Sequence, residues 1–478
     1  MDRGRGSEDL LHETTVEPQR LRDVVANLLA RGGVVEGLLV AQTAGGALEV
    51  RCIAVLPDGP LLIRSPAPSR EAPTLVDLAP ALDWDEREAR DQYGISFAGG
   101  AHRALVDHPD DPAAWITTIV GDDVHQIAVG PIHAGVIESG HFRFHSVGER
   151  ILHVDTRLFY KHRGLQRAAQ GLSPARALPV VQRACAACAA ANTLAFAQAV
   201  EQASGLWPSD ELRRARTLLL ELERLYNHLN DLGQICAGVG FAPGAMVFAS
   251  FKERAQRTIQ ALVGHRFLFG SVAIGASHLS VSPVGAAAAR GDLEDMRPEV
   301  LRAWRALLLD PSLRDRVRGA GELPHDEARR LGTVGPAARA SGVREDVRED
   351  SPRLWYPGFA TTMPTEMAGD VASRMEARAS ELVQTFAILD ELLSGAVVPA
   401  RAEAGGPTGA HGLGRVESAR GRTWCAVELE GGAVHRVHLR TSSYANWPSV
   451  ARAATGAILP DFPLINKSFE LCYACADR

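Results

Sequence analysis

Apolar and polar positions divide the chain into a short mixed region and a longer region of helical spacing. Apolar residues recur at helical intervals over residues 21–31, and two strand-like runs, 50–56 and 61–64, flank the turn Pro57-Asp-Gly-Pro60. An acidic helix is predicted over residues 83–93, with Gly94 at its end. The pattern therefore predicts a small α/β unit at the start of the chain.

The rest of the pattern is mainly helical. Leucine repeats at helical spacing over residues 212–232 and 371–393. Residues 423–440 alternate as strands around Gly431-Gly432, which predicts a hairpin. The charged run 344–353 is typical of a solvated loop or a helix end, unless the metal region uses part of it.

Length and composition fit a soluble chain of more than one domain. The 478 residues are 46% hydrophobic and 23% charged, with a net charge of −6, so a nucleic-acid partner is not expected. We place one domain at residues 1–110, a connector at 111–125 and a second domain at 126–478. The expected fold is α+β, with a small N-terminal α/β domain followed by a large, mainly helical domain with peripheral β-structure.

No export signal or membrane span is predicted. The first residues lack an apolar core, and no stretch approaches the roughly 20 apolar residues that a membrane span requires. We therefore expect a cytoplasmic protein whose contact with a membrane is made through partner subunits.

Two C-x-x-C pairs carry the candidate chemistry. The first is Cys185-Ala-Ala-Cys188, before an alanine-rich stretch, and the second is Cys472-Tyr-Ala-Cys475. We expect the first two sulfurs on one helix face, where a helix N-terminus lowers the thiol pKa. Thiolates suit nickel, zinc or iron.

Pairing alone favours a closed structural zinc site, and a redox pair is the weaker alternative. The wide separation of the two pairs counts against zinc, because zinc pairs usually lie much closer together. The total of seven cysteines argues against a disulfide framework. From the residues alone, the identity of the metal stays open.

Motifs around these pairs resemble the large subunits of nickel–iron hydrogenases, most closely the group 4, energy-converting enzymes related to respiratory complex I. The matching segments are residues 130–133, 138–142, 155–164, 221–228, 339–342, 369–370, 417–421 and 468–472. Residues 84–94 resemble the 30-kDa subunit of complex I, and residues 126–478 resemble its 49-kDa subunit. A fusion of two such domains is similar to the large subunit of formate hydrogenlyase.

The resemblance implies a nickel–iron centre held by Cys185, Cys188, Cys472 and Cys475. The second cysteine of each pair, Cys188 and Cys475, would bridge to an iron that carries carbon monoxide and cyanide. Arg420 would polarise dihydrogen, and Ser443 would hydrogen-bond a cyanide. A buried ion pair between Arg420 and Glu417 is an alternative of equal weight on sequence alone.

The chain departs from the family pattern beside the expected centre. Gln166 stands where the family has a proton-transferring glutamate, and an amide cannot titrate near neutral pH. We expect Glu138 or His133 to substitute through water, or turnover to be impaired; a buried structural histidine is the other interpretation of His133. Asn192 replaces a usual histidine, and Glu470-Leu471 replaces Asp-Pro.

The expected activity is interconversion of H2 with protons and electrons. Because no further cluster motif is found, a small subunit with a proximal 4Fe–4S cluster is required. The resemblance adds a ferredoxin-like subunit, membrane antiporter-like subunits and, as a further candidate, formate dehydrogenase, at the inner face of the cell membrane. Ending three residues past Cys475, the chain is interpreted as a processed form or one without a C-terminal extension.

Two other functions are kept open. One is a hydrogenase-related or NADH–quinone oxidoreductase-like protein that binds quinone and couples another redox reaction to ion transport. Complex I itself lacks the four cysteines, which disfavours a pure quinone reductase, whereas Gln166 keeps this alternative open. The other is a non-catalytic scaffold with structural zinc.

Overall fold

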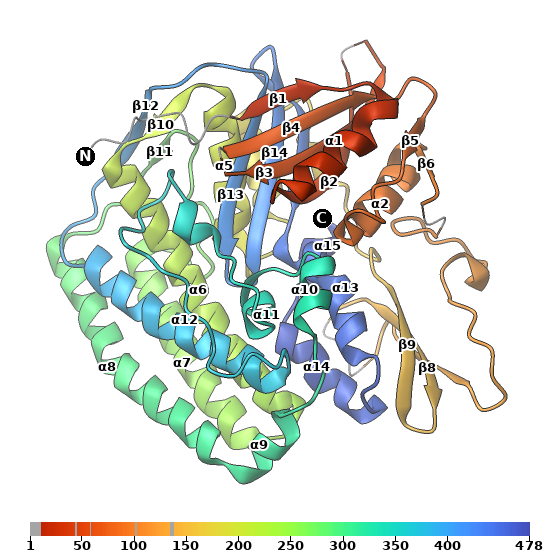
Figure 1. The fold of residues 1–478 in the computed structure, drawn as a ribbon. Coiled ribbons are helices and arrows are strands. Elements are labelled where there is room, and N and C mark those ends of the chain that lie inside the picture. The colour runs from red at the N-terminus through yellow and green to blue at the C-terminus, as the bar shows by residue number, and fades with distance from the viewer. Residues whose placement is uncertain (1–10, 44, 58, 101–102, 134–137) are drawn as a thin grey trace.

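The computed structural model describes residues 11–43, 45–57, 59–100, 103–133 and 138–478. Its N-terminal unit, residues 12–98, is built on a four-stranded sheet of order β1-β4-β3-β2, in which β1 and β4 are parallel and the other pairs antiparallel (Figure 1). The elements of this unit are β1 (His12–Thr15), α1 (Pro18–Ala30), β2 (Val34–Gln42), β3 (Leu48–Leu56), β4 (Gly59–Pro66), β5 (Glu71–Pro73), η1 (Pro80–Leu82), α2 (Asp83–Tyr93) and β6 (Ser96–Ala98). The predicted helices and strands are confirmed, and Gly94 ends α2 in the left-handed conformation.

Both faces of the N-terminal sheet are covered. One face packs on α1 through residues such as Leu21 and Val25. The other face, which includes Leu39 and Ile53, packs against Trp424 of the second sheet. Burial on both sides explains why β2 and β3 are almost continuously apolar.

Long helices pack side by side to form the body of the large region (Figure 1). They are α6 (Asp210–Gly238), α7 (Ala242–Val263), α8 (Pro283–Leu309) and α12 (Val371–Leu392). Ser209 caps α6 by accepting the Leu212 N–H, and Asp370 caps α12 by accepting the Ser373 N–H. The helices predicted from leucine spacing are therefore confirmed.

A second sheet, β13-β14-β15, lies between the N-terminal sheet and α5 (Ala189–Ala203). Its strands are β13 (His411–Ser418), β14 (Gly421–Glu430) and β15 (Ala433–Arg440), so the predicted hairpin is confirmed. Gly412 and Gly414 allow β13 to approach α5 closely, because a Cβ at either position would overlap a carbonyl of that helix. This contact fixes the sheet against the helix that follows the first cysteine pair.

A separate core surrounds the second cysteine pair. It is formed by the hairpin β8 (His141–Val147) and β9 (Arg150–Arg157) with α13 (Ser442–Ala454), α14 (Phe462–Phe469) and α15 (Tyr473–Asp477). Trp84 of α2 belongs to this core, so the N-terminal unit packs on the end of the chain.

The remaining elements are short and connect these layers. They are η2 (Pro112–Ala114), β7 (His125–Val129), α3 (Leu165–Ala169), α4 (Pro174–Gln182), β10 (Leu206–Pro208), β11 (Ala276–Ser277), α9 (Pro311–Val317), α10 (His325–Arg330), α11 (Gly335–Ala340), η3 (Val347–Asp350), β12 (Ala400–Ala404) and η4 (Leu459–Asp461). No helix in the described ranges is long and apolar enough to cross a membrane.

The prediction of a solvated segment at residues 344–353 is wrong at its centre. Arg348 is buried and pairs with Asp346 at 2.7 Å. Further contacts to Glu221 and Glu381 make Arg348 part of an internal ion network. The network explains how so strongly charged a run can lie inside the protein.

Candidate metal centre

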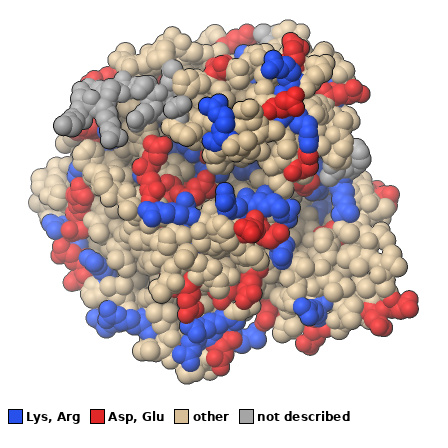
Figure 2. Space-filling model, in the orientation of Figure 1, with Lys and Arg blue, Asp and Glu red and all other residues tan. Residues whose placement is uncertain are grey.

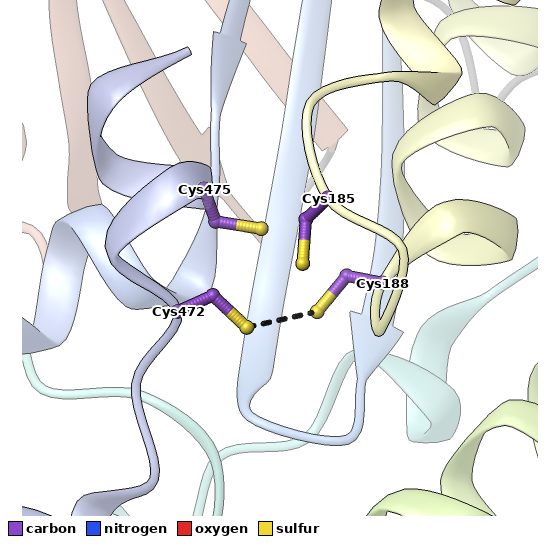
Figure 3. A group of neighbouring side chains, drawn as sticks. All are labelled: Cys185, Cys188, Cys472 and Cys475. Atoms are coloured by element: carbon purple, nitrogen blue, oxygen red, sulfur yellow. Dashed lines mark hydrogen bonds between the residues drawn. The ribbon is translucent and has the colours of Figure 1, made fainter. Parts of the chain in front are cut away.

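Four cysteine sulfurs from the two C-x-x-C pairs converge on one point (Figure 3). All four Sγ atoms lie within 4.8 Å of one another, and the Sγ atoms of Cys188 and Cys472 are 3.9 Å apart. Cys185 and Cys188 lie in the turn before α5, whereas Cys472 precedes α15 and Cys475 lies within it. The expectation that the first two sulfurs share a helix face is wrong, because this turn comes before the helix begins.

The sulfurs influence one another's protonation. Hydrogen bonds with neighbouring thiols, first that of Cys188, hold the pKa of Cys185 well below its ordinary value. The neighbouring thiols, first that of Cys185, raise the pKa of Cys188 and Cys475. The four thiols therefore cannot all lose their protons together unless a cation balances the charge. A soft divalent metal fits this donor set.

Helix α6 holds the turn that carries the first pair. Tyr226 and Asn227 both donate to the carbonyl of Ala187, at 2.9 and 2.7 Å. Glu223 accepts the N–H groups of the first turn of α5, and burial raises the pKa of this carboxyl to about 8. Three side chains of one rigid helix thus position Cys188.

Arg420 lies in the β13–β14 turn and faces Cys188. Its Nη1 is 3.9 Å from the Cys188 Sγ and donates to Asn227 at 2.8 Å, and its Nη2 pairs with Asp231 at 3.4 Å. Its Nε donates to the carbonyl of Glu470. The alternative interpretation, a buried ion pair between Arg420 and Glu417, is wrong: Arg420 pairs with Asp231 instead.

Glu417 has other partners. It accepts from Arg339 at 3.1 Å and from the Val347 N–H at 3.3 Å. Burial raises the pKa of Glu417 to about 7. Its neighbourhood is the internal ion network, not the cysteine cluster.

Two polar side chains fix the second pair. The Ser443 hydroxyl accepts the N–H of Cys472 at 3.0 Å, and Thr441 donates to the carbonyl of Cys475 at 2.9 Å. Asn192, from α5, donates to the Cys475 Sγ at 3.7 Å. Ser443 therefore lies beside the cluster, as expected. Asn192, which replaces a histidine usual in the family, contacts a sulfur directly.

The candidate proton-transfer residues differ in their surroundings. Glu138 accepts the N–H of Ala474, between the two C-terminal cysteines, at 2.8 Å. Gln166 is buried, accepts the Leu439 N–H at 3.2 Å and lines a cavity of about 620 Å³. His133 is exposed, so the interpretation of it as a buried structural histidine is wrong. Residues 134–137, between His133 and Glu138, lie outside the described ranges.

Sequence reasoning missed several residues that hold the cluster. Asn227 and Asp231 lie four positions apart on α6, a spacing that places them on one face. Arg163 donates to carbonyls next to both cysteine pairs, at Arg183, Ala184 and Ala474. The helical spacing could have indicated the first two; only the fold brings Arg163 to both pairs.

Comparison with known proteins identifies the family. Residues 14–114 match the model for the 30 Kd subunit of respiratory-chain NADH dehydrogenase, and residues 239–404 match that for the 49 Kd subunit. The chain is 31% identical over 446 residues to formate hydrogenlyase subunit 5 of Escherichia coli (strain K12), covering 85% of this chain and 77% of that protein. The chain belongs to the large subunits of complex I-related hydrogenases.

Other matches include proteins that are not named as hydrogenases. The chain is 26% identical over 484 residues to a subunit of the NADH-quinone oxidoreductase of Rhodopseudomonas palustris (strain BisB18), covering 86% of this chain and 83% of that protein. A chain of the membrane-bound sulfane sulfur reductase, an archaeal respiratory membrane complex, shares the fold, with a TM-score of 0.69 at 23% identity over 76% of this chain and 100% of that one. The predicted α+β fold and the resemblance to both complex I subunits are confirmed. The chain is a member of an oxidoreductase family.

The charged side chains on the face shown in Figure 2 do not gather into a patch of one sign. Lys and Arg lie interspersed with Asp and Glu across the visible surface. This mixed surface agrees with the small net charge of −6.

Proposed function

We propose that this chain is the catalytic large subunit of a membrane-associated nickel–iron hydrogenase. The observation that carries the proposal is the convergence of four thiols beneath Arg420. A structural zinc site needs the four sulfurs alone and gives no reason for a buried arginine to face one of them. Relatives whose names include hydrogenase support the assignment.

The donor set fits a nickel–iron centre. Cys185, Cys188, Cys472 and Cys475 would hold the nickel–iron centre, whose iron would carry carbon monoxide and cyanide. Such a centre, when bound, supplies Lewis-acid polarisation of dihydrogen and accepts its electrons. The amide of Asn192 and the hydroxyl of Ser443 would set the hydrogen bonding on the cluster's second pair.

Three residues have separate proposed roles in charge stabilisation and proton transfer. Arg420, oriented by Asn227 and Asp231, presents a fixed positive charge on the Cys188 side. Glu138 lies against the backbone of the Cys472–Cys475 turn, where its carboxylate can exchange protons with water, and His133 would continue the path to solvent.

Electrons would leave through partner subunits. Among the described residues, these four cysteines are the one group of at least three candidate metal ligands whose donor atoms lie together. A small subunit with a proximal 4Fe–4S cluster would therefore receive the electrons. A ferredoxin-like subunit, membrane antiporter-like subunits and formate dehydrogenase complete the proposed assembly, at the cytoplasmic face of the cell membrane.

Metal analysis and infrared spectroscopy of the purified complex test this function. Nickel and iron together, with infrared bands from carbon monoxide and cyanide, would support it. Zinc in place of nickel, without those bands, would refute it and favour the scaffold. The quinone-linked alternative is favoured by the match to the NADH-quinone oxidoreductase of Rhodopseudomonas palustris and by Gln166. Quinone reduction without H2 activity would support that alternative.

Replacing Gln166 by glutamate is expected to raise H2 turnover by about tenfold, because it restores a titratable group at the position where the family has a proton-transferring glutamate. The fold should tolerate the change, since a carboxylate oxygen can still accept the Leu439 N–H. Dye-linked H2 oxidation measured across pH tests this. Gln170→Glu is the matched control, because Gln170 lines the same cavity. Equal effects of the two changes, or none, would mean that protons already use another route.

A further inference from the structure

The side chain of Arg478 is held by two separate parts of the chain. Its Nη1 donates to the carbonyl of Leu439 at 2.8 Å, and its Nη2 pairs with Glu88 of α2. The guanidinium also lies over the ring of Tyr444, 4.5 Å from its centroid. Only 1% of Arg478 is exposed, so its charge depends on these partners.

Glu88 belongs to the N-terminal unit, far from Arg478 in sequence. The same helix places Trp84 edge-on against Tyr444 at 5.5 Å, and Asp85 against Arg440 at 3.2 Å. Helix α2 therefore packs against Arg440 of β15 and Tyr444 of α13, and the ring of Tyr444 also contacts the guanidinium of Arg478. In Figure 1, α2 lies beside α15 and the C-terminal end.

The segment 472–478 cannot hold its own shape. Helix α15 has only five residues, too few to be stable alone. It is held by other segments: besides the bonds from Ser443, Thr441 and Glu138, Asp477 accepts the N–H groups of Phe159 and Lys161, and Arg163 N–H donates to the Arg478 carbonyl. Among the hydrogen bonds and ion pairs of this segment with described residues, the pair with Glu88 is the one made by the N-terminal unit.

We propose that Glu88 is a positioning residue that, through Arg478, holds the segment 472–478 closed over the cysteine cluster. Docking of the N-terminal unit would thus keep Cys472 and Cys475 next to Cys185 and Cys188. Only the identity of the metal rests on the proposed function. The closure itself does not, because it concerns the positions of the four thiols whether or not a metal is bound. The N-terminal unit thereby acquires a role at the centre, although it contributes none of the four cysteines.

Accessibility of the cysteines tests the closure. Glu88→Gln in the full-length, metal-free chain should raise the rate of iodoacetamide labelling of Cys472 and Cys475, read by mass spectrometry, by about tenfold or more. Hydrogen exchange over 472–478 should rise as well, while exchange in β3 stays unchanged. In the metal-loaded complex, loss of metal to a chelator should accelerate by a similar factor.

Glu36→Gln is the matched control. Glu36 is a buried carboxylate of the same N-terminal unit, but it pairs with Arg415 and Arg422 and not with the segment 472–478. Labelling of Cys472 and Cys475 should stay at the native rate in this variant. Equal acceleration in both variants would overturn the proposal, because it would indicate general loosening between the two parts of the chain.

Two further variants keep the test decisive. Glu88→Asp retains the charge but shortens the reach, so it should accelerate labelling even if Glu88→Gln fails to fold. The double change Glu88→Arg with Arg478→Glu should restore part of the protection lost in either single change. Native labelling rates in Glu88→Asp, or no rescue in the double variant, would refute the ion pair as the closing contact. Because labelling needs no nickel, a zinc-loaded protein with this pattern would refute the proposed function alone.

Discussion

Replacing Cys472 by serine is expected to abolish nickel loading and H2 oxidation. A serine hydroxyl does not ionise near neutral pH and is a poor donor to a soft metal. Cys472 is half-buried, and its Sγ lies 3.9 Å from that of Cys188. Loss of this ligand should cost more than the roughly 10- to 100-fold typical of residues that only support a ligand. Metal content and H2–deuterium exchange measure the effect.

Cys425→Ala provides the control for cysteine loss itself. Cys425 is buried in β14, outside the cluster, and burial alone raises the pKa of its thiol. The alanine variant should keep native metal content and exchange activity, with only a modest loss of stability. Native exchange activity in Cys472→Ser would refute the ligand assignment.

The candidate ligands can be found from the sequence, but their surroundings cannot. Spacing and motif order indicate the four cysteines and Arg420, because these features are local. The prediction for the partner of Arg420 is wrong, since Asp231 reaches it from α6 and Glu417, its near neighbour in sequence, turns toward Arg339. Such choices depend on which buried charges the fold places side by side.

For the fold, too, local features can be predicted from the sequence and distant contacts cannot. Amphipathic spacing and turn glycines correctly predict α6, α12 and the β14–β15 hairpin. Strand β2 is not predicted, because its apolar run is broken by Glu36 and Gly37 and carries no alternation. The prediction for the charged run around Arg348 is wrong for a related reason: its partners, Glu221 and Glu381, lie on distant helices.

Arg420 is the residue whose geometry most strongly suggests a role beyond packing. Its guanidinium satisfies Asn227, Asp231 and the Glu470 carbonyl while one Nη points toward the Cys188 Sγ. Burial and the charge of Asp231 raise the pKa of Glu470 to about 8, so this departure from the family's Asp-Pro keeps a titratable carboxyl beside the arginine. A planar fork of donors can meet all these partners at once, and a lysine ammonium cannot.

Arg420→Lys is therefore expected to retain the metal but lower H2 turnover by about 10²- to 10³-fold, the usual effect of removing one preorganised donor. All four cysteines remain, so nickel content should stay near native and the infrared bands should shift only slightly. Arg422→Lys is the matched control: Arg422 is an equally buried arginine two positions along the chain, but it pairs with Glu36 and Glu345. Turnover near native in the Arg422 variant and sharply reduced in the Arg420 variant would assign the effect to the cluster. Loss of metal in Arg420→Lys would instead show that this arginine is needed to assemble the site.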